Sequence, residues 1–72
     1  MSAVSTRSIE EAGSELAAAL VARERAERQL VTWAMLTNDV KFEDAVRWVE
    51  ADEKAHQAGL KLKSRVKGMR DE

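Results

Sequence analysis

The feature that most constrains this chain is a pair of long stretches, free of proline, in which apolar residues recur at alternating steps of three and four. Such spacing places the repeated residues on one side of an α-helix, because the helix completes a turn every ~3.6 residues. The stretches run from about Ile9 to Leu36 and from Phe42 to Val66. Each is predicted to form one long amphipathic helix.

A short polar segment, residues 37–41, separates the two predicted helices. Asn38 and Asp39 favour a turn, since their side chains bond to nearby backbone N–H groups. Helices of similar length joined by a short loop form an antiparallel hairpin. The predicted fold class is therefore all-α, a two-helix antiparallel hairpin.

Local signals place the helix ends. Ser8 and Glu11 fit a capping box at the first helix, and Asp39 is the N-cap candidate for the second. Gly68 is expected to end the second helix in a left-handed conformation. With the turn as the centre of symmetry, the numbers of facing residues add up to roughly 79. That register places Leu20 opposite Gly59, Gly13 opposite Val66, and Arg28 opposite Asp52.

Length and composition limit the chain to one small domain. The 72 residues contain no cysteine, so neither a disulfide nor a thiolate metal site can stabilise it. We expect a helical domain over residues 8–69, with flexible segments at 1–7 and 70–72. The net charge of −1 gives no argument for binding nucleic acid or membranes. No apolar run approaches the ~20 residues of a membrane span, and we expect a cytoplasmic location.

The second predicted helix carries two apolar stripes, of which a single partner helix can cover only one. One stripe begins with Ala45 and Trp48, and the other with Phe42, Val46 and Val49. We therefore expect the hairpin to self-associate, most simply as two hairpins in a four-helix bundle. The interface is expected to include the following side chains: Leu30, Trp33, Leu36, Phe42, Ala45, Trp48 and Val49.

The function that these features favour is a small non-enzymatic protein–protein interaction module, such as an adaptor, a chaperone-like subunit or an inhibitor. It would act through an apolar helical face, with itself and another protein as partners and without a cofactor. The chain contains one histidine and no cysteine, so it offers no conventional catalytic pair.

A second hypothesis comes from Glu53 and His56, which lie one helical turn apart on the same face. The segment from Val49 to His56 is similar to the metal-binding helix of ferritin-like di-iron proteins. The resemblance implies a di-metal site assembled by dimerisation, and an oxidase or storage function. The implied ligands are two copies of the following residues: Glu24 or Glu27, Glu53 and His56.

A third hypothesis is RNA binding by a hairpin dimer, because the end of the second helix is basic. Cations near a helix C-terminus also complement the helix dipole, and no aromatic residue lies among them to stack on bases. We therefore favour a structural role for them. The basic residues are Lys61, Lys63, Arg65, Lys67 and Arg70.

Overall fold

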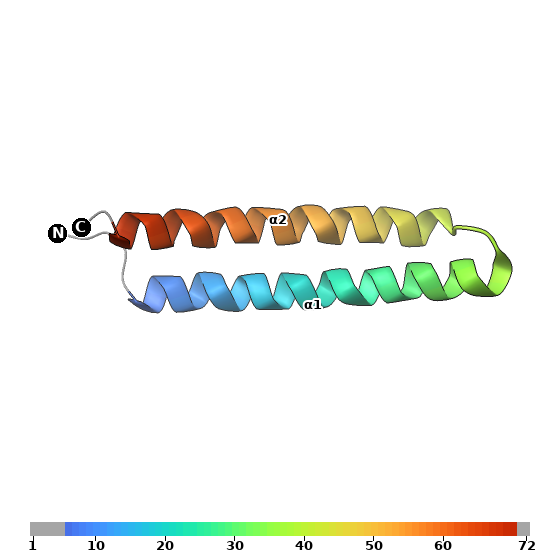
Figure 1. The fold of residues 1–72 in the computed structure, drawn as a ribbon, viewed down its shortest axis with the longest axis horizontal. Helices are drawn as coiled ribbons and strands as arrows, with labels where there is room; N and C mark the ends of the chain where they lie inside the picture. Colours follow the sequence, from blue (N-terminus) through green and yellow to red (C-terminus); the bar gives the residue numbers. More distant parts are fainter. Residues whose placement is uncertain (1–5, 71–72) are drawn as a thin grey trace.

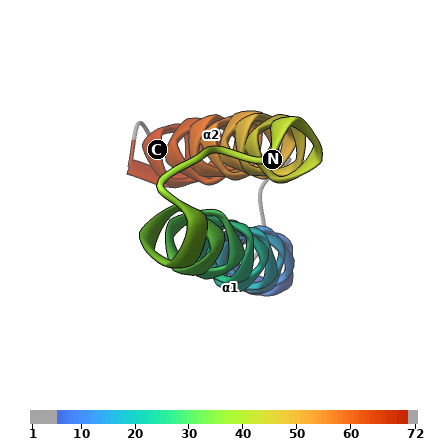
Figure 2. The same ribbon diagram turned by 90° about the vertical axis from the view of Figure 1, so that its right-hand side faces the viewer.

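The computed structural model describes residues 6–70 and shows two helices, α1 from Thr6 to Thr37 and α2 from Phe42 to Arg70. They lie side by side in antiparallel orientation, joined by a short loop (Figures 1 and 2). This confirms the predicted all-α hairpin. Both helices are longer than expected, with 32 and 29 residues. Of the segments expected to be flexible, 1–5 and 71–72 lie outside the described residues, whereas 6–7 and 70 are helical.

A left-handed residue ends α1. Asn38 has a φ of 56°, and its N–H donates to the carbonyl of Ala34 at 2.9 Å. This is the single-bond form of helix C-terminal cap, in which asparagine is one of the few residues tolerated in place of glycine. The Thr37 hydroxyl donates to the carbonyl of Trp33 at 2.8 Å and supports the same turn.

The expected N-cap of α2 is wrong by two residues. The Asp39 carboxylate accepts the N–H of its neighbour Val40 at 2.9 Å instead of binding the first turn of α2. The first helical bond runs from the N–H of Ala45 to the carbonyl of Lys41 at 3.1 Å. Lys41 therefore occupies the capping position, although its side chain has no acceptor.

The other two predicted helix ends are also wrong. Ser8 lies inside α1, which is already helical at Thr6, so it is not the N-cap. Gly68 lies inside α2, and no glycine among residues 6–70 has a positive φ. Neighbouring residues with good helix propensity carry both helices through these weak stop signals.

The helices pack along a seam, defined here as the residues at the three-and-four spacing that face the other helix. Small residues occupy its most buried positions, where Ala12 and Ala55 are 0% and 4% exposed. Alanine and glycine allow the two backbones to approach closely, at the cost of burying little apolar area. The seam residues are Ile9, Ala12, Leu16, Ala19, Arg23, Ala26 and Leu30 of α1, and Ala45, Trp48, Asp52, Ala55, Gly59 and Leu62 of α2.

The register differs from the prediction by about one helical turn. Residue numbers of facing pairs add up to 75 or 76, as for Lys61 with Glu15 and Gly59 with Leu16. A Cβ added to Gly13 would meet nothing within 4 Å, so the expected contact with Val66 is absent.

The hairpin is not symmetric about its turn, which explains this shift. After the cap at Asn38, three more residues precede α2, and the last turn of α1 projects past the first turn of α2. Met35 and Leu36, on that projecting turn, are 79% and 77% exposed.

The shape is a rod. The Cα atoms extend over 57 × 14 × 14 Å, with a radius of gyration of 16.3 Å. A globular chain of this length would have a radius of gyration of about 11 Å. Each helix consequently has one neighbour and a solvated perimeter.

Candidate interaction surface

The large apolar side chains of this protein lie mainly on its surface. Among the described residues, the fully buried apolar side chains are two alanines, and no large side chain is fully buried. The exposed large ones are Leu20, Val21, Val31, Trp33, Met35, Leu36, Val40, Phe42, Val46, Val49, Leu60, Val66 and Met69. Contiguous apolar surface of this kind marks interaction sites in soluble proteins.

Part of this surface forms a continuous line along α2, here called the outer stripe. It consists of Phe42, Val46, Val49, Glu53, His56 and Leu60, all of which are exposed. From Val46 onward, each member of the stripe comes directly after a seam residue in the sequence. The stripe therefore runs along one edge of the seam. Its spacing of four and three is that of a second helix-packing face.

The outer stripe has a counterpart on α1. In an antiparallel pair, residues that follow the seam on one helix lie beside residues that follow it on the other. The α1 residues in these positions include Leu20, Glu24, Glu27 and Val31, which are exposed. One long face of the hairpin therefore carries apolar residues from both helices, with charged groups at its centre.

The opposite edge of the seam is polar and is used within the hairpin. Lys61 of α2 forms an ion pair with Glu15 of α1, with an Nζ–Oε2 distance of 3.0 Å. Beside it, the Arg65 guanidinium donates to the backbone carbonyl of Ser8 at 2.7 Å. The two edges thus differ, because these polar contacts bridge the helices on one edge, whereas among the described residues no hydrogen bond or ion pair joins the helices on the outer-stripe edge.

The turn end adds a second group of exposed apolar residues. The Lys41 ammonium lies 5.1 Å from the centre of the Trp33 ring, a distance suited to a cation–π contact. Trp33 is nevertheless 42% exposed, and Phe42 is 79% exposed. The turn end therefore presents two aromatic rings to solvent.

The predicted interface residues fall into two groups. Leu30, Ala45 and Trp48 belong to the seam and are partly buried against the other helix. The following four are exposed and remain available to a partner: Trp33, Leu36, Phe42 and Val49. The sequence analysis assigned Leu20 to the seam and did not single out Val31. Both belong to the exposed face of α1, and the signal was their position directly after the seam residues Ala19 and Leu30.

The candidate metal ligands are not brought together by one chain. Glu24 forms an ion pair with Arg28 of its own helix at 3.2 Å, and not with α2. Glu53 and His56 are exposed, and neither has an ion-pair or hydrogen-bond partner among the described residues. Within residues 6–70 no group of three or more His, Asp and Glu side chains is placed to hold a metal ion.

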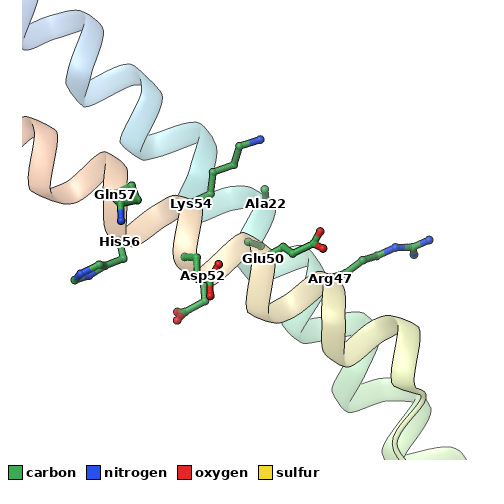
Figure 3. A pocket seen from close by; sticks show the side chains of 9 residues that line it. Ala22, Arg47, Glu50, Asp52, Lys54, His56 and Gln57 are labelled. Atoms are coloured by element: carbon green, nitrogen blue, oxygen red, sulfur yellow. The ribbon is translucent and has the colours of Figure 1, made fainter.

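Figure 3 shows a shallow hollow on α2 that His56 helps to line. His56 and Lys54 project from the helix in different directions, so the lining side chains do not converge on a point. The hollow also includes Arg47 and Gln57, and it offers no convergent set of ligands.

Two of the candidate nucleic-acid-binding residues, Lys61 and Arg65, make the contacts with α1 described above. Lys63 and Lys67 are exposed, and the side chain of Arg70 lies outside the described part of the chain. The structure thus supplies a structural use for part of the basic segment.

Over the residues that the structure describes, neither helix has a stretch that is both long and apolar enough to cross a membrane. Comparison of the chain with protein-family models, curated proteins and solved structures finds no match. The function must therefore be inferred from the surface of the hairpin itself.

Proposed function

We propose that this protein is a small non-enzymatic protein–protein interaction module, of the adaptor, chaperone-like or inhibitor type, that acts through its exposed apolar helical face. The observation that carries the proposal is the distribution of apolar side chains. Among the described residues, no large apolar side chain is fully buried in the seam, while valines, leucines and aromatic residues of the turn end and outer stripe face solvent.

The energetics of a small domain support this reading. Burial of apolar surface stabilises a fold by roughly 25 cal/mol per Å². The seam contributes little of it, because no large side chain among the described residues is fully buried. A chain of this size is marginal even when globular. Covering the apolar face with a partner would stabilise the folded hairpin by mass action, and would remove its apolar surface from water.

The proposal is tested by measuring the sedimentation of the tagged 72-residue chain in a lysate of the cells that produce it. Sedimentation velocity should show the wild type moving as an assembly larger than its 8.0 kDa. Val46→Glu with Val49→Glu should move as the free chain, because two carboxylates would have to be desolvated in the interface.

The matched control adds the same charge to the other edge of α1. Gln29 and Thr32 are exposed and lie on the side of α1 away from the outer-stripe edge, so Gln29→Glu with Thr32→Glu should leave the assembly intact. A wild-type chain that sediments alone in the lysate would contradict the proposed function.

A further inference from the structure

We infer that the occupant of the apolar face is a second copy of this chain, docked antiparallel so that Glu53 of each copy faces His56 of the other across a twofold axis. This inference rests on the proposed function and specifies its partner.

The spacing of the outer stripe supports the antiparallel arrangement. The stripe repeats every seven residues, with Val46, Glu53 and Leu60 in one set and Phe42, Val49 and His56 in the other. In antiparallel helix pairs, members of one set face members of the other. A twofold axis between Glu53 and His56 then places Glu53 against His56 of the second copy, and Val49 against Leu60 of the second copy.

Polar complementarity follows from this pairing, because an imidazole N–H can donate to a carboxylate. Two Glu53–His56 contacts form at the centre, where neither side chain has a partner in the part of its own chain that the structure describes. They are flanked on both sides by Val49–Leu60 contacts. Farther out, Val46 and Phe42 lie near Lys63 and Lys67 of the second copy, whose aliphatic stems can cover apolar surface.

The same rotation places α1 of one copy on α1 of the other. In the register of the Lys61–Glu15 pair, the twofold axis meets α1 between Val21 and Ala22. Glu24 and Glu27 would then lie near Leu20 and Ala17 of the second copy. No carboxylates of the two copies oppose each other in this arrangement.

The parallel arrangement, with the axis along the rod, has the opposite charge balance. It would place α2 of one copy on α1 of the other, with Glu53 against Glu24 and Val49 against Glu27. Like charges in an interface are unfavourable by several kcal/mol. Within the chain, Glu24 has the partner Arg28, whereas Glu53 has no ion-pair partner among the described residues.

The available area suits a dimer. One long face of the rod, 57 by 14 Å between Cα atoms, measures about 800 Å² in projection. Stable interfaces of standard size bury about 800 Å² on each partner. Docking over the whole face therefore gives a four-helix bundle with an ordinary interface area.

The first test is a charge swap, measured by sedimentation equilibrium of the purified full-length chain. Glu53→Lys alone and His56→Glu alone should each raise the dimer dissociation constant at least about tenfold. The first removes the carboxylate that accepts from the imidazole, and the second places two carboxylates against each other. The double variant Glu53→Lys/His56→Glu should restore it to within about threefold. Circular dichroism confirms that each variant remains helical. In a parallel dimer Glu53→Lys would instead tighten association, because the new lysine would face Glu24.

The second test uses introduced cysteines, which are informative because the chain has none of its own. Chains carrying Val49→Cys and Leu60→Cys should form a disulfide when mixed and oxidised, and neither should link to itself. Those two positions are 11 residues apart, or about 16 Å along α2, beyond the reach of a disulfide between identical positions. The Lys54 side chain projects away from His56 in Figure 3, so two chains carrying Lys54→Cys should not form a disulfide with each other.

The outcomes separate this inference from the proposed function. Disulfides between Val46→Cys and Val31→Cys chains, or tighter binding of Glu53→Lys, would establish the parallel arrangement and overturn the inference. A monomeric purified chain at ~100 μM would exclude a stable self-dimer with the usual affinity of such interfaces. The same chain could still move in lysate as a larger assembly that is lost in the Val46→Glu/Val49→Glu variant. In that case the partner would be another protein, and the proposed function would stand.

Discussion

Arg23 and Asp52 meet across the middle of the hairpin, with the guanidinium Nη1 3.7 Å from the carboxylate Oδ1. Both occupy seam positions, and their side chains are 44% and 50% exposed. A polar pair in an apolar seam disfavours other registers, since any slip separates the two charges. The predicted register, which is wrong by about one helical turn, made Arg28 the partner of Asp52. In the structure Arg28 instead contacts Glu24.

We predict that Arg23→Leu/Asp52→Leu raises the free energy of unfolding by about 1 kcal/mol, because leucines extend the apolar seam and a half-exposed pair contributes little. Each single change should alter it by less than about 1 kcal/mol. Urea denaturation provides the measurement, at one protein concentration for all variants. A double variant less stable than either single one would show that the ion pair contributes more than its exposure implies.

Gly59 gives a test of the observed register. A Cβ at this position would lie 3.9 Å from Cδ1 of Leu16, an ordinary van der Waals distance. Gly59→Ala should therefore fit without displacing Leu16, and should raise the free energy of unfolding by up to ~1 kcal/mol through helix propensity. Gly13→Ala, at a position open within the chain, is the comparison. A loss of stability at Gly59 alone would mean that the helices lie closer together than described.

The fold was predictable because its signals are long and periodic. Absence of proline, sustained spacing of three and four, and one polar break define two helices without reference to tertiary contacts. The register was not predictable, because it depends on the conformation of four loop residues. Asn38 indicated a turn from the sequence, but only its left-handed φ of 56° shows how α1 ends before the chain turns back.

Asn38 should therefore be sensitive to substitution in a specific way. Glycine adopts a left-handed conformation without steric cost, so Asn38→Gly should leave the free energy of unfolding unchanged or slightly raised. Asn38→Val should lower it by about 1–2 kcal/mol, since a β-branched side chain clashes in that region. Thermal melts compare the two variants. Equal melting temperatures would imply that the loop adopts another conformation in solution.

The candidate site was predictable in part. The Phe42, Val46 and Val49 stripe follows from helical spacing, and its exposure follows from there being only one partner helix. The contacts that Lys61 and Arg65 make with α1 could not be predicted from the sequence, because they depend on which α1 residues lie opposite. Trp48 was assigned to the interface, and the structure places it in the seam, where it is partly buried.

Metal analysis distinguishes the ferritin-like hypothesis from the interaction module. We expect the purified chain, after dialysis against a weak chelator, to retain no stoichiometric Fe, Mn or Zn, and its melting temperature to be unaffected by added metal. The physical reason is that Glu24 is paired with Arg28 and no acidic cluster is preassembled within residues 6–70. Retained metal at roughly one ion per chain, lost in His56→Ala, would favour the di-metal site.

The indole N–H of Trp48 is buried and has no hydrogen-bond partner within residues 6–70. A buried donor left unsatisfied costs about 1–3 kcal/mol, and phenylalanine removes the donor while keeping an aromatic ring in the seam. Trp48→Phe should therefore be at least as stable as the wild type in urea denaturation, the lost donor offsetting the smaller ring. Trp33→Phe, at the exposed ring beside Lys41, is the control and should change the free energy of unfolding by less than about 0.5 kcal/mol. If Trp48→Phe instead loses more than about 1 kcal/mol, the indole N–H has an acceptor in solution, such as a trapped water.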